Sequence, residues 1–525
     1  MYFVVILAFA LVLSDTLPPR QCNLFAGQPL TRGLPLFGTL AVIAGQFLIV
    51  WALAWIARRK TLARLDGTGD GHDAAADTYA FYQQVFLFVL AGGLVLTMVF
   101  TPWAGLVRAG WGLGRFPLVG DLLLLMPFFG SLLLIWTLLF PVEQRLRAEA
   151  IGDAAEPVES PNHGRNAAIE TLGRARHASS LAPPTLFGYL LDKVRHQLLI
   201  LAVPMSIIVL AKHLIENYAG RLINLPADRT IQDIILNGAL GTVSVIVLAF
   251  APVMMRYIWA TEPLPAGKLR ERFASTCKRI GLRYREILLW HTHGTAVNAA
   301  VMGFVAPLRY ILISDALLET MDEDEIEAVF GHEAGHVRHW HLPFFGVFAV
   351  VSMYAAGGAM YLLFYIDRSI DPGILQLVAL STLLAMWLFG FSWLSRKFER
   401  QADLFSVRCV TPDIRRCVAA CPVHGERRSA GLCISAANLF GRTLGKIADL
   451  NGIPREAPSW RHGSIESRCR LIESFATDNA ALVRFDRKLL RIKIGLIVIA
   501  LVASGVALWL YRVPLIAQAR RLGWL

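Results

Sequence analysis

Long apolar blocks are the feature that most constrains how this 525-residue chain can fold. A helix needs about 20 mainly apolar residues to cross a hydrocarbon core roughly 30 Å thick. Eight blocks reach about this length: Leu34–Ala57, Tyr82–Phe100, Leu118–Phe140, Leu198–Ile215, Ile234–Met255, Leu342–Ile366, Ile374–Leu394 and Ile494–Tyr511. Only 17% of the residues are charged, against about a quarter in soluble domains. We therefore predict an integral membrane protein, which excludes a soluble protein, a disordered protein and a small disulfide scaffold.

The charge of the loops orients these spans. Lys and Arg concentrate in 58–80, 141–197, 256–341 and 395–493, and the positive-inside rule places such loops in the cytoplasm and the carboxyl terminus outside. A shorter ninth block, Tyr2–Leu13, has neither a basic n-region nor a small-residue cleavage site, so we interpret it as a marginal first span. The excess of 51 Lys and Arg over 39 Asp and Glu follows from this basic face, and we predict no nucleic-acid partner.

The segment before the sixth block contains the pattern H-E-x-x-H. His332 and His336 lie four residues apart, so on a helix both imidazoles project from one face and can bind one Zn²⁺. Glu333 can take a proton from metal-bound water and pass it to a leaving amine. Thr320–Glu323 indicates a capping box, and the acidic residues that follow favour a helix start, so we predict a helix over 322–341. The pattern alone also occurs by chance on exposed charged helices.

A candidate third ligand follows the hairpin formed by the sixth and seventh blocks. The chain returns there to the membrane border with Ser395-Arg-Lys-Phe-Glu-Arg-Gln-Ala-Asp403. Glu399 can complete a site of two His and one carboxylate that leaves the fourth position to water. Asp403, four residues on, can orient a ligand imidazole through its second nitrogen. A solvated acidic face is the alternative, but H-E-x-x-H at the other foot of the hairpin favours the metal site.

Together these patterns resemble the membrane zinc metallopeptidases that include the CAAX prenyl proteases and the HtpX heat-shock proteases. The likeness covers roughly residues 270–475 and includes three further stretches: Val297-Asn-Ala-Ala, Ile311-Leu-Ile-Ser-Asp-Ala-Leu-Leu318 and His462-Gly-Ser-Ile-Glu-Ser-Arg468. It implies a gluzincin endopeptidase with Glu333 as general base and acid. The implied zinc ligands are His332, His336 and Glu399.

The resemblance also implies roles for His462 and Arg468, which would lie near the site and help to stabilise the oxyanion. This chain departs from the family at two neighbouring positions. Gly463 stands where the family usually has Pro, and Cys469 stands where it usually has Ile or Val.

Two short β-rich runs, 297–305 and 309–314, precede the motif helix. An edge strand formed there could bind an extended peptide by main-chain pairing. The resemblance places Asn298 on this strand, beside the substrate.

Several cysteines follow Glu399 in a C-x7-C-x3-C-x11-C series, with His424 nearby: Cys409, Cys417, Cys421 and Cys433. A small structural zinc site is one interpretation. The spacing is not the usual C-x2-C pair, so we expect free thiols there instead. His339 and His341 follow the motif closely, and we expect them at the surface or behind a ligand rather than on the metal.

We therefore predict a mainly α, polytopic helical membrane protein of eight or nine spans, with a small α+β zincin-type catalytic domain split by a transmembrane hairpin. The predicted parts are an amino-terminal membrane region of five or six spans, 1–258, with a mobile loop near 148–185; catalytic parts at 259–341 and 395–490; the hairpin, 342–394; and a carboxyl-terminal span and tail, 491–525.

The predicted function is zinc-dependent hydrolysis of peptide bonds in membrane or membrane-associated proteins, at a cytoplasmic site. An intramembrane site-2-type protease is the first alternative. It is disfavoured because Arg338, His339 and His341 place the motif at the interface, and because Glu399 stands where an aspartate is expected. A non-catalytic scaffold or regulator with a structural metal is the second, and it would have no need of Glu333. Prenylated tails and misfolded membrane proteins both stay open as substrates, and the oligomeric state is open.

Overall fold

The computed structural model describes most of the chain. The described residues are 34–67, 71–116, 118–154, 185–222, 229–292, 297–410, 417, 421, 423–424, 431–451, 453–510 and 512. The predicted span Tyr2–Leu13 lies outside them, as do residues 155–184 of the loop predicted near 148–185. Residues 148–154 of that loop instead continue helix α6 (Met126–Ala154), which is consistent with the good helix formers Ala and Glu at its start.

Eight helices in the described part of the chain are long and apolar enough to cross a membrane. They are Pro35–Leu65, Ala74–Met98, Met126–Leu146, Leu186–Gly220, Ile231–Ile258, His341–Ile366, Pro372–Val410 and Asn479–Leu510. Each of the eight predicted blocks overlaps one of them, so the predicted mainly α, polytopic fold is confirmed.

Large apolar side chains cover the outside of these helices. Phe88 and Phe389 are each 76% exposed, as a lipid-facing surface requires. The third span begins at Met126 rather than at Leu118, because Leu118 adopts a positive φ of 71° and a short separate helix, α5 (Val119–Leu124), follows it.

The chain forms two compact units, and α10 (Arg229–Ile258) contributes residues to both. The other elements of the first unit are α2 (Leu34–Leu65), α3 (Gly71–Phe100), α4 (Trp103–Gly105), η1 (Leu106–Gly110), η2 (Leu113–Arg115), α5, α6, α8 (Leu186–Lys193), η3 (Val194–Leu199) and α9 (Ile200–Leu222). Helices α2, α3 and α6 share a core that includes Val50, Leu90 and Phe128. Gln46 is buried within it and donates to the Ser131 hydroxyl at 3.1 Å, which satisfies a polar group inside a span.

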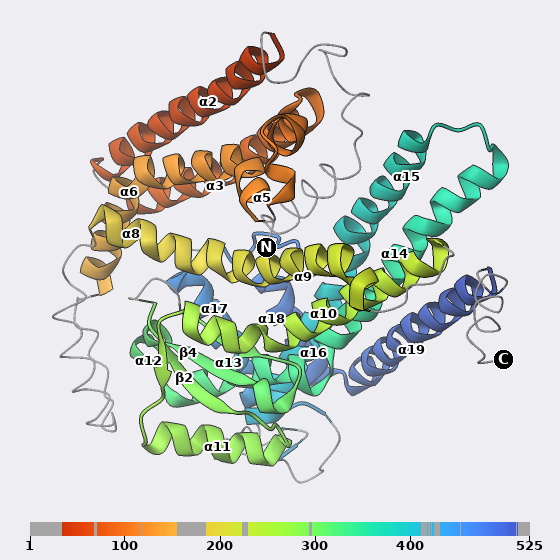
Figure 1. The fold of residues 1–525 in the computed structure, drawn as a ribbon. Helices are drawn as coiled ribbons and strands as arrows, with labels where there is room; N and C mark the ends of the chain where they lie inside the picture. The colour runs from red at the N-terminus through yellow and green to blue at the C-terminus, as the bar shows by residue number, and fades with distance from the viewer. Residues whose placement is uncertain are drawn as a thin grey trace. The chain divides into compact units, whose positions relative to one another are not determined.

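The second unit contains a four-stranded mixed sheet beside α11 (Lys268–Ile280), α12 (Asp315–Thr320) and α13 (Glu323–Arg338) (Figure 1). The strands are β1 (Thr261–Pro263), β2 (Glu286–Trp290), β3 (Ala299–Met302) and β4 (Tyr310–Ser314), with a 3₁₀ turn, η4 (Ala306–Leu308), before β4. Their order is β1-β2-β4-β3, with β2 and β4 parallel and both outer pairs antiparallel. One face packs on Phe273 of α11 and Phe330 of α13, and the other on Trp259 and the end of α10. Strand β3 therefore lies at an edge of the sheet.

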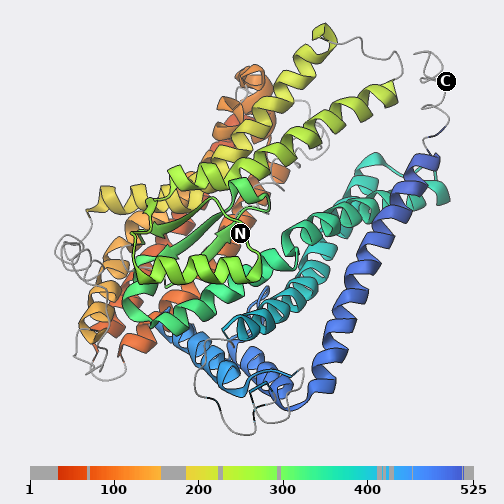
Figure 2. The ribbon, with the colours of Figure 1, turned by 90° about the horizontal axis from the view of Figure 1, so that it is seen from below.

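A long helical hairpin follows α13. Its first arm is α14 (His341–Ile366), and its second is one helical run made of α15 (Pro372–Ala385), the π-helical turn η5 (Met386–Phe391) and α16 (Ser392–Val410); Figure 2 gives a second view of both arms. The second arm passes 394, where the predicted span ended, because Ser395–Val410 is helical and packs against α13 instead of leaving the helix. The remaining described helices of this unit are α17 (Ile434–Leu450), α18 (Ile465–Thr477) and α19 (Asn479–Leu510).

Candidate metal centre

Helix α13 presents the H-E-x-x-H pattern, and its start is fixed by a capping box. The carboxylate of Asp322 accepts from the backbone N–H of Glu325 at 2.8 Å, and the Glu325 side chain accepts from the Asp322 N–H at 3.1 Å. The predicted box at Thr320–Glu323 is wrong by two residues, because the Thr320 hydroxyl donates back to the Ala316 carbonyl within α12. The helix also ends at Arg338, short of the predicted 341, where Trp340 turns the chain with φ 60°.

Two glycines let α13 approach α16 closely. A Cβ on Gly335 would lie 3.0 Å from the Cα of Ala402, and one on Gly331 would lie 3.2 Å from the Cα of Ser406. Ser406 also donates its hydroxyl to the Ala328 carbonyl of α13 at 2.6 Å. This contact between backbones brings the side chains of α16 within reach of the two histidines on α13.

Three candidate ligands meet between the two helices. The Nε2 atoms of His332 and His336 are 3.3 Å apart, and carboxylate oxygens of Glu399 lie 3.4 Å and 3.6 Å from them, respectively. Tetrahedral zinc with bonds of about 2.0–2.1 Å separates its ligand atoms by about 3.3–3.4 Å. Two imidazoles and one carboxylate are also a donor set that zinc accepts while keeping a fourth position open. The residues present therefore fit a zinc ion.

Behind His332 lies a buried ion pair. An Asp403 oxygen is 2.9 Å from the Nδ1 of His332, while the Arg468 guanidinium donates to both Asp403 oxygens at 2.9 Å and 2.5 Å. Asp403 is 1% exposed and Arg468 is 5% exposed. Burial lowers the pKa of His332, but the contacts with Asp403 and Glu399 outweigh it and raise that pKa to about 10 in the metal-free protein. Zinc binding would therefore displace a proton from His332.

A second hydrogen-bonded chain lies behind His336. Its Nδ1 is 2.9 Å from the Nδ1 of His341, whose Nε2 is 3.0 Å from the side-chain oxygen of Gln401. Lys493 of α19 donates to the same Gln401 oxygen at 2.9 Å. His341 is fully buried behind a candidate ligand. Gln401 and Lys493 were not predicted, since nothing in their sequence spacing links them to the motif.

Glu333 differs from the groups around it. Within the described residues its carboxylate makes neither a hydrogen bond nor an ion pair, and burial raises its pKa. A carboxylate of raised pKa beside a metal site has the properties of a general base.

His462 and Arg468 approach Glu399 from the start of α18. The Nδ1 of His462 lies 2.8 Å from a Glu399 oxygen, and 42% of the His462 side chain is exposed. Arg468 is 3.8 Å from the same oxygen, but its guanidinium is engaged with Asp403. His462 is thus accessible from solvent, whereas Arg468 is enclosed behind the ligands.

Asn298 directly precedes the edge strand β3. Its side chain is exposed, and its backbone pairs with Ser314 at the end of β4: the Asn298 N–H donates to the Ser314 hydroxyl, and its carbonyl accepts from the Ser314 N–H, both at 3.0 Å.

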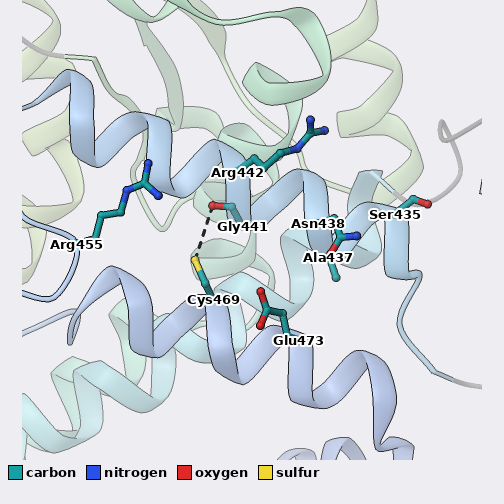
Figure 3. Close-up of a pocket in the computed structure, with 8 residues that line it drawn as sticks. All are labelled: Ser435, Ala437, Asn438, Gly441, Arg442, Arg455, Cys469 and Glu473. Carbon is teal, nitrogen blue, oxygen red and sulfur yellow. Dashed lines mark hydrogen bonds between the residues drawn. The ribbon is translucent and has the colours of Figure 1, made fainter.

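A separate pocket of about 660 Å³ lies between α17 and α18. Figure 3 shows its lining, in which the Cys469 thiol of α18 lies 3.7 Å from the Gly441 carbonyl of α17. None of the candidate metal ligands lines this pocket.

Comparison with known proteins agrees with this geometry. Residues 263–429, which contain the two histidines and Glu399, match peptidase family M48. This segment is an M48 peptidase domain. Metallopeptidases of this family depend on zinc. The predicted resemblance and the predicted enzyme class are thereby confirmed for the domain.

Similar proteins include members of both predicted groups. A CAAX prenyl protease 1 homolog of Arabidopsis thaliana is 27% identical over 181 residues, which are 31% of this chain and 42% of that protein. A Protease HtpX homolog of Thermoplasma acidophilum is 27% identical over 168 residues, which are 31% of this chain and 52% of that protein. The chain thus spans about half the length of the curated relatives it matches. The crystal structure of S. mikatae Ste24p aligns with 84% of this chain and 99% of its own at 15% identity, with a TM-score of 0.46.

Proposed function

We propose that this chain is a membrane-embedded zinc endopeptidase that hydrolyses peptide bonds of membrane or membrane-associated proteins. The observation that carries the proposal is the meeting of His332, His336 and Glu399 at tetrahedral spacing, with Glu333 unpaired among the described residues beside them. A structural metal site needs ligands but no base, so the carboxylate at Glu333 favours hydrolysis over a scaffold.

When bound, zinc would supply Lewis-acid chemistry that polarises a carbonyl and activates a water. His332, His336 and Glu399 would hold it. The contact between Asp403 and the Nδ1 of His332 keeps the proton on that nitrogen and leaves the Nε2 lone pair for the metal. His341 performs the corresponding task for His336.

The proton transfers fall to Glu333, whose carboxylate would accept a proton from the attacking water and give it to the leaving amine. We propose that His462, the exposed neighbour of Glu399, donates to the oxyanion. Arg468 would act through Asp403, as a positioning residue.

The arrangement of the second unit supports a membrane-associated substrate. Helix α13 ends at Arg338, and the apolar helix α14 begins only three residues later, so His332 and His336 lie shortly before a candidate span. Among the described residues no strand pairs with the outer side of the edge strand β3, which the exposed Asn298 precedes, so an extended peptide could pair there. We further propose that this side faces the cytoplasm, because the loops around the domain are rich in Lys and Arg.

The test is cleavage by the full chain in detergent, wild type beside Glu333→Gln and a control variant, with zinc measured in all three proteins. Two substrates are offered, an unfolded protein and a farnesylated C-a-a-X peptide, since relatives carry the names of both kinds of protease. The matched control is Glu271→Gln, an exposed glutamate on α11.

We expect equal zinc in all three proteins and cleavage by the wild type and Glu271→Gln alone. A folded wild type that binds no zinc, or cleavage that survives in Glu333→Gln, would contradict the proposal.

A further inference from the structure

A second group of metal-binding side chains lies between α16 and α17, outside the site described above. It consists of Cys417, Cys421, His424 and Cys433, whose ligand atoms all lie within 4.8 Å of one another. The sulfurs of Cys417 and Cys433 are 3.5 Å apart, and the Cys421 sulfur is 3.8 Å from the Nδ1 of His424. Cys409, which the sequence pattern suggested as a member, is not in the group.

The sulfur–sulfur distance and the sulfur–nitrogen distance are each within about 0.3 Å of those in a tetrahedral zinc site. Zinc binds sulfur at about 2.3 Å and nitrogen at about 2.0–2.1 Å, so ligand sulfurs lie about 3.8 Å apart and sulfur and nitrogen about 3.5 Å apart. A disulfide would instead bring two sulfurs to about 2.05 Å, and Cys417 and Cys433 are free thiols.

The surroundings of the sulfurs supply hydrogen-bond donors, as thiolate ligands require. The Ser435 hydroxyl donates to the Cys417 sulfur at 3.3 Å. The backbone N–H groups of Val423, His424 and Ile434 also donate to the Cys421 sulfur.

We propose that Cys417, Cys421, His424 and Cys433 bind one structural Zn²⁺. Four protein ligands close the coordination sphere, which is the mark of a structural site rather than a catalytic one. The proposal does not depend on the peptidase activity, because none of these four residues belongs to the centre at His332.

The position of this second site indicates which part of the fold a bound metal would stabilise. Cys433 directly precedes α17, and the buried Cys421 and Cys433 share a core with Val410, the last residue of α16. A metal there would join the segment that follows α16 to the start of α17, and α16 is the helix that carries Glu399 and Asp403. It would hold in place the helix that supplies the third catalytic ligand.

The experiment uses the full chain with the first site removed. Wild type is expected to hold two zinc ions per chain and the double variant His332→Ala/His336→Ala one. The remaining zinc should be released by a mercurial reagent that blocks thiols. Replacement by Co²⁺ should give strong thiolate-to-cobalt charge-transfer absorption in the near ultraviolet.

Adding Cys421→Ser to the double variant should remove the remaining zinc. Adding Cys469→Ser, the matched control, should leave it, because that thiol lies at the pocket in Figure 3 and outside the group. If the Cys421→Ser variant does not fold, the cobalt spectrum of the double variant alone tests whether the cysteine group binds the metal. A folded double variant without metal, a cobalt form without thiolate bands, or a Cys417–Cys433 disulfide in non-reduced peptides would overturn the proposal.

Discussion

Gly335 sets the distance between the two helices that carry the zinc ligands, and Gly335→Ala is expected to weaken zinc binding. The new Cβ would lie 3.0 Å from the Cα of Ala402 and 3.1 Å from the Cβ of Phe405. Because carbon atoms in contact lie about 3.5–4.0 Å apart, α16 must move away by about 0.5 Å. Glu399 lies one turn from Ala402 and moves with it, whereas zinc–ligand distances tolerate only about 0.2 Å.

The magnitude follows from two opposing terms. Overpacking of this kind costs about 1–3 kcal/mol, and alanine regains about 1 kcal/mol over glycine within a helix. The net loss of folding stability is therefore at most about 2 kcal/mol, and the protein should still fold. If the displacement of Glu399 reduces the free energy of zinc binding by a comparable amount, about 1.4 kcal/mol, zinc affinity falls about tenfold.

The assay strips the protein of metal and measures the free zinc concentration that restores half of the cleavage activity. This readout reports the centre at His332, because cleavage depends on that centre, and a control variant measured in parallel corrects for zinc bound at the cysteine group. The control is Gly346→Ala on α14, where an added Cβ meets nothing within 4 Å, and it should behave as wild type. Wild-type zinc affinity in Gly335→Ala would refute the claim that close helix packing positions Glu399.

Three further predictions test the surroundings of the site. Asp403→Asn removes the carboxylate that pairs most closely with the buried Arg468 and should cost about 3–5 kcal/mol in the free energy of unfolding. Adding Arg468→Met should recover part of this loss in thermal unfolding, and no recovery would count against the ion pair. His341→Phe removes the hydrogen bond to His336 and should weaken zinc binding about 10–100-fold in the same reactivation assay. Unchanged affinity would show that this hydrogen bond does not contribute to zinc binding. Burial, with the charges of neighbouring cations, lowers the pKa of His339 to about 4, so the stability that its neutral form contributes is present above its unfolded pKa of about 6.5 and is lost as the pH falls toward 4. His339→Gln should therefore flatten the fall in melting temperature between pH 7 and pH 5, and an equally steep fall would contradict this assignment.

Much of the fold could be predicted because the bilayer imposes a simple rule on sequence. A span must be apolar over its whole length, and all eight predicted blocks overlap candidate spans. The candidate ligands on α13 and α16 could likewise be found, since residues four apart share a helix face. The resemblance supplied His462 and Arg468, whose separation from Glu399 in the sequence gives no signal of contact.

The remaining features depend on contacts that no local pattern specifies. The Thr320 hydroxyl could cap the next helix or donate to a carbonyl one turn earlier in α12, and the structure has the second arrangement. The chain from His341 to Gln401 and Lys493 joins three helices, so no periodicity connects its members. The cysteine group contains His424 and not Cys409. Cys409 is buried on α16, where it packs against Gly331 of α13 instead.

In the proposed zinc centre, the two helices α13 and α16 supply three ligands to one ion. The most direct measurement is an anomalous difference map at the zinc edge from crystals of the full chain grown with zinc. We expect a peak within about 2.0–2.2 Å of the Nε2 atoms of His332 and His336 and of a Glu399 oxygen. A zinc-loaded crystal with no peak there, or a peak bound by the two histidines while Glu399 lies out of reach, would contradict it.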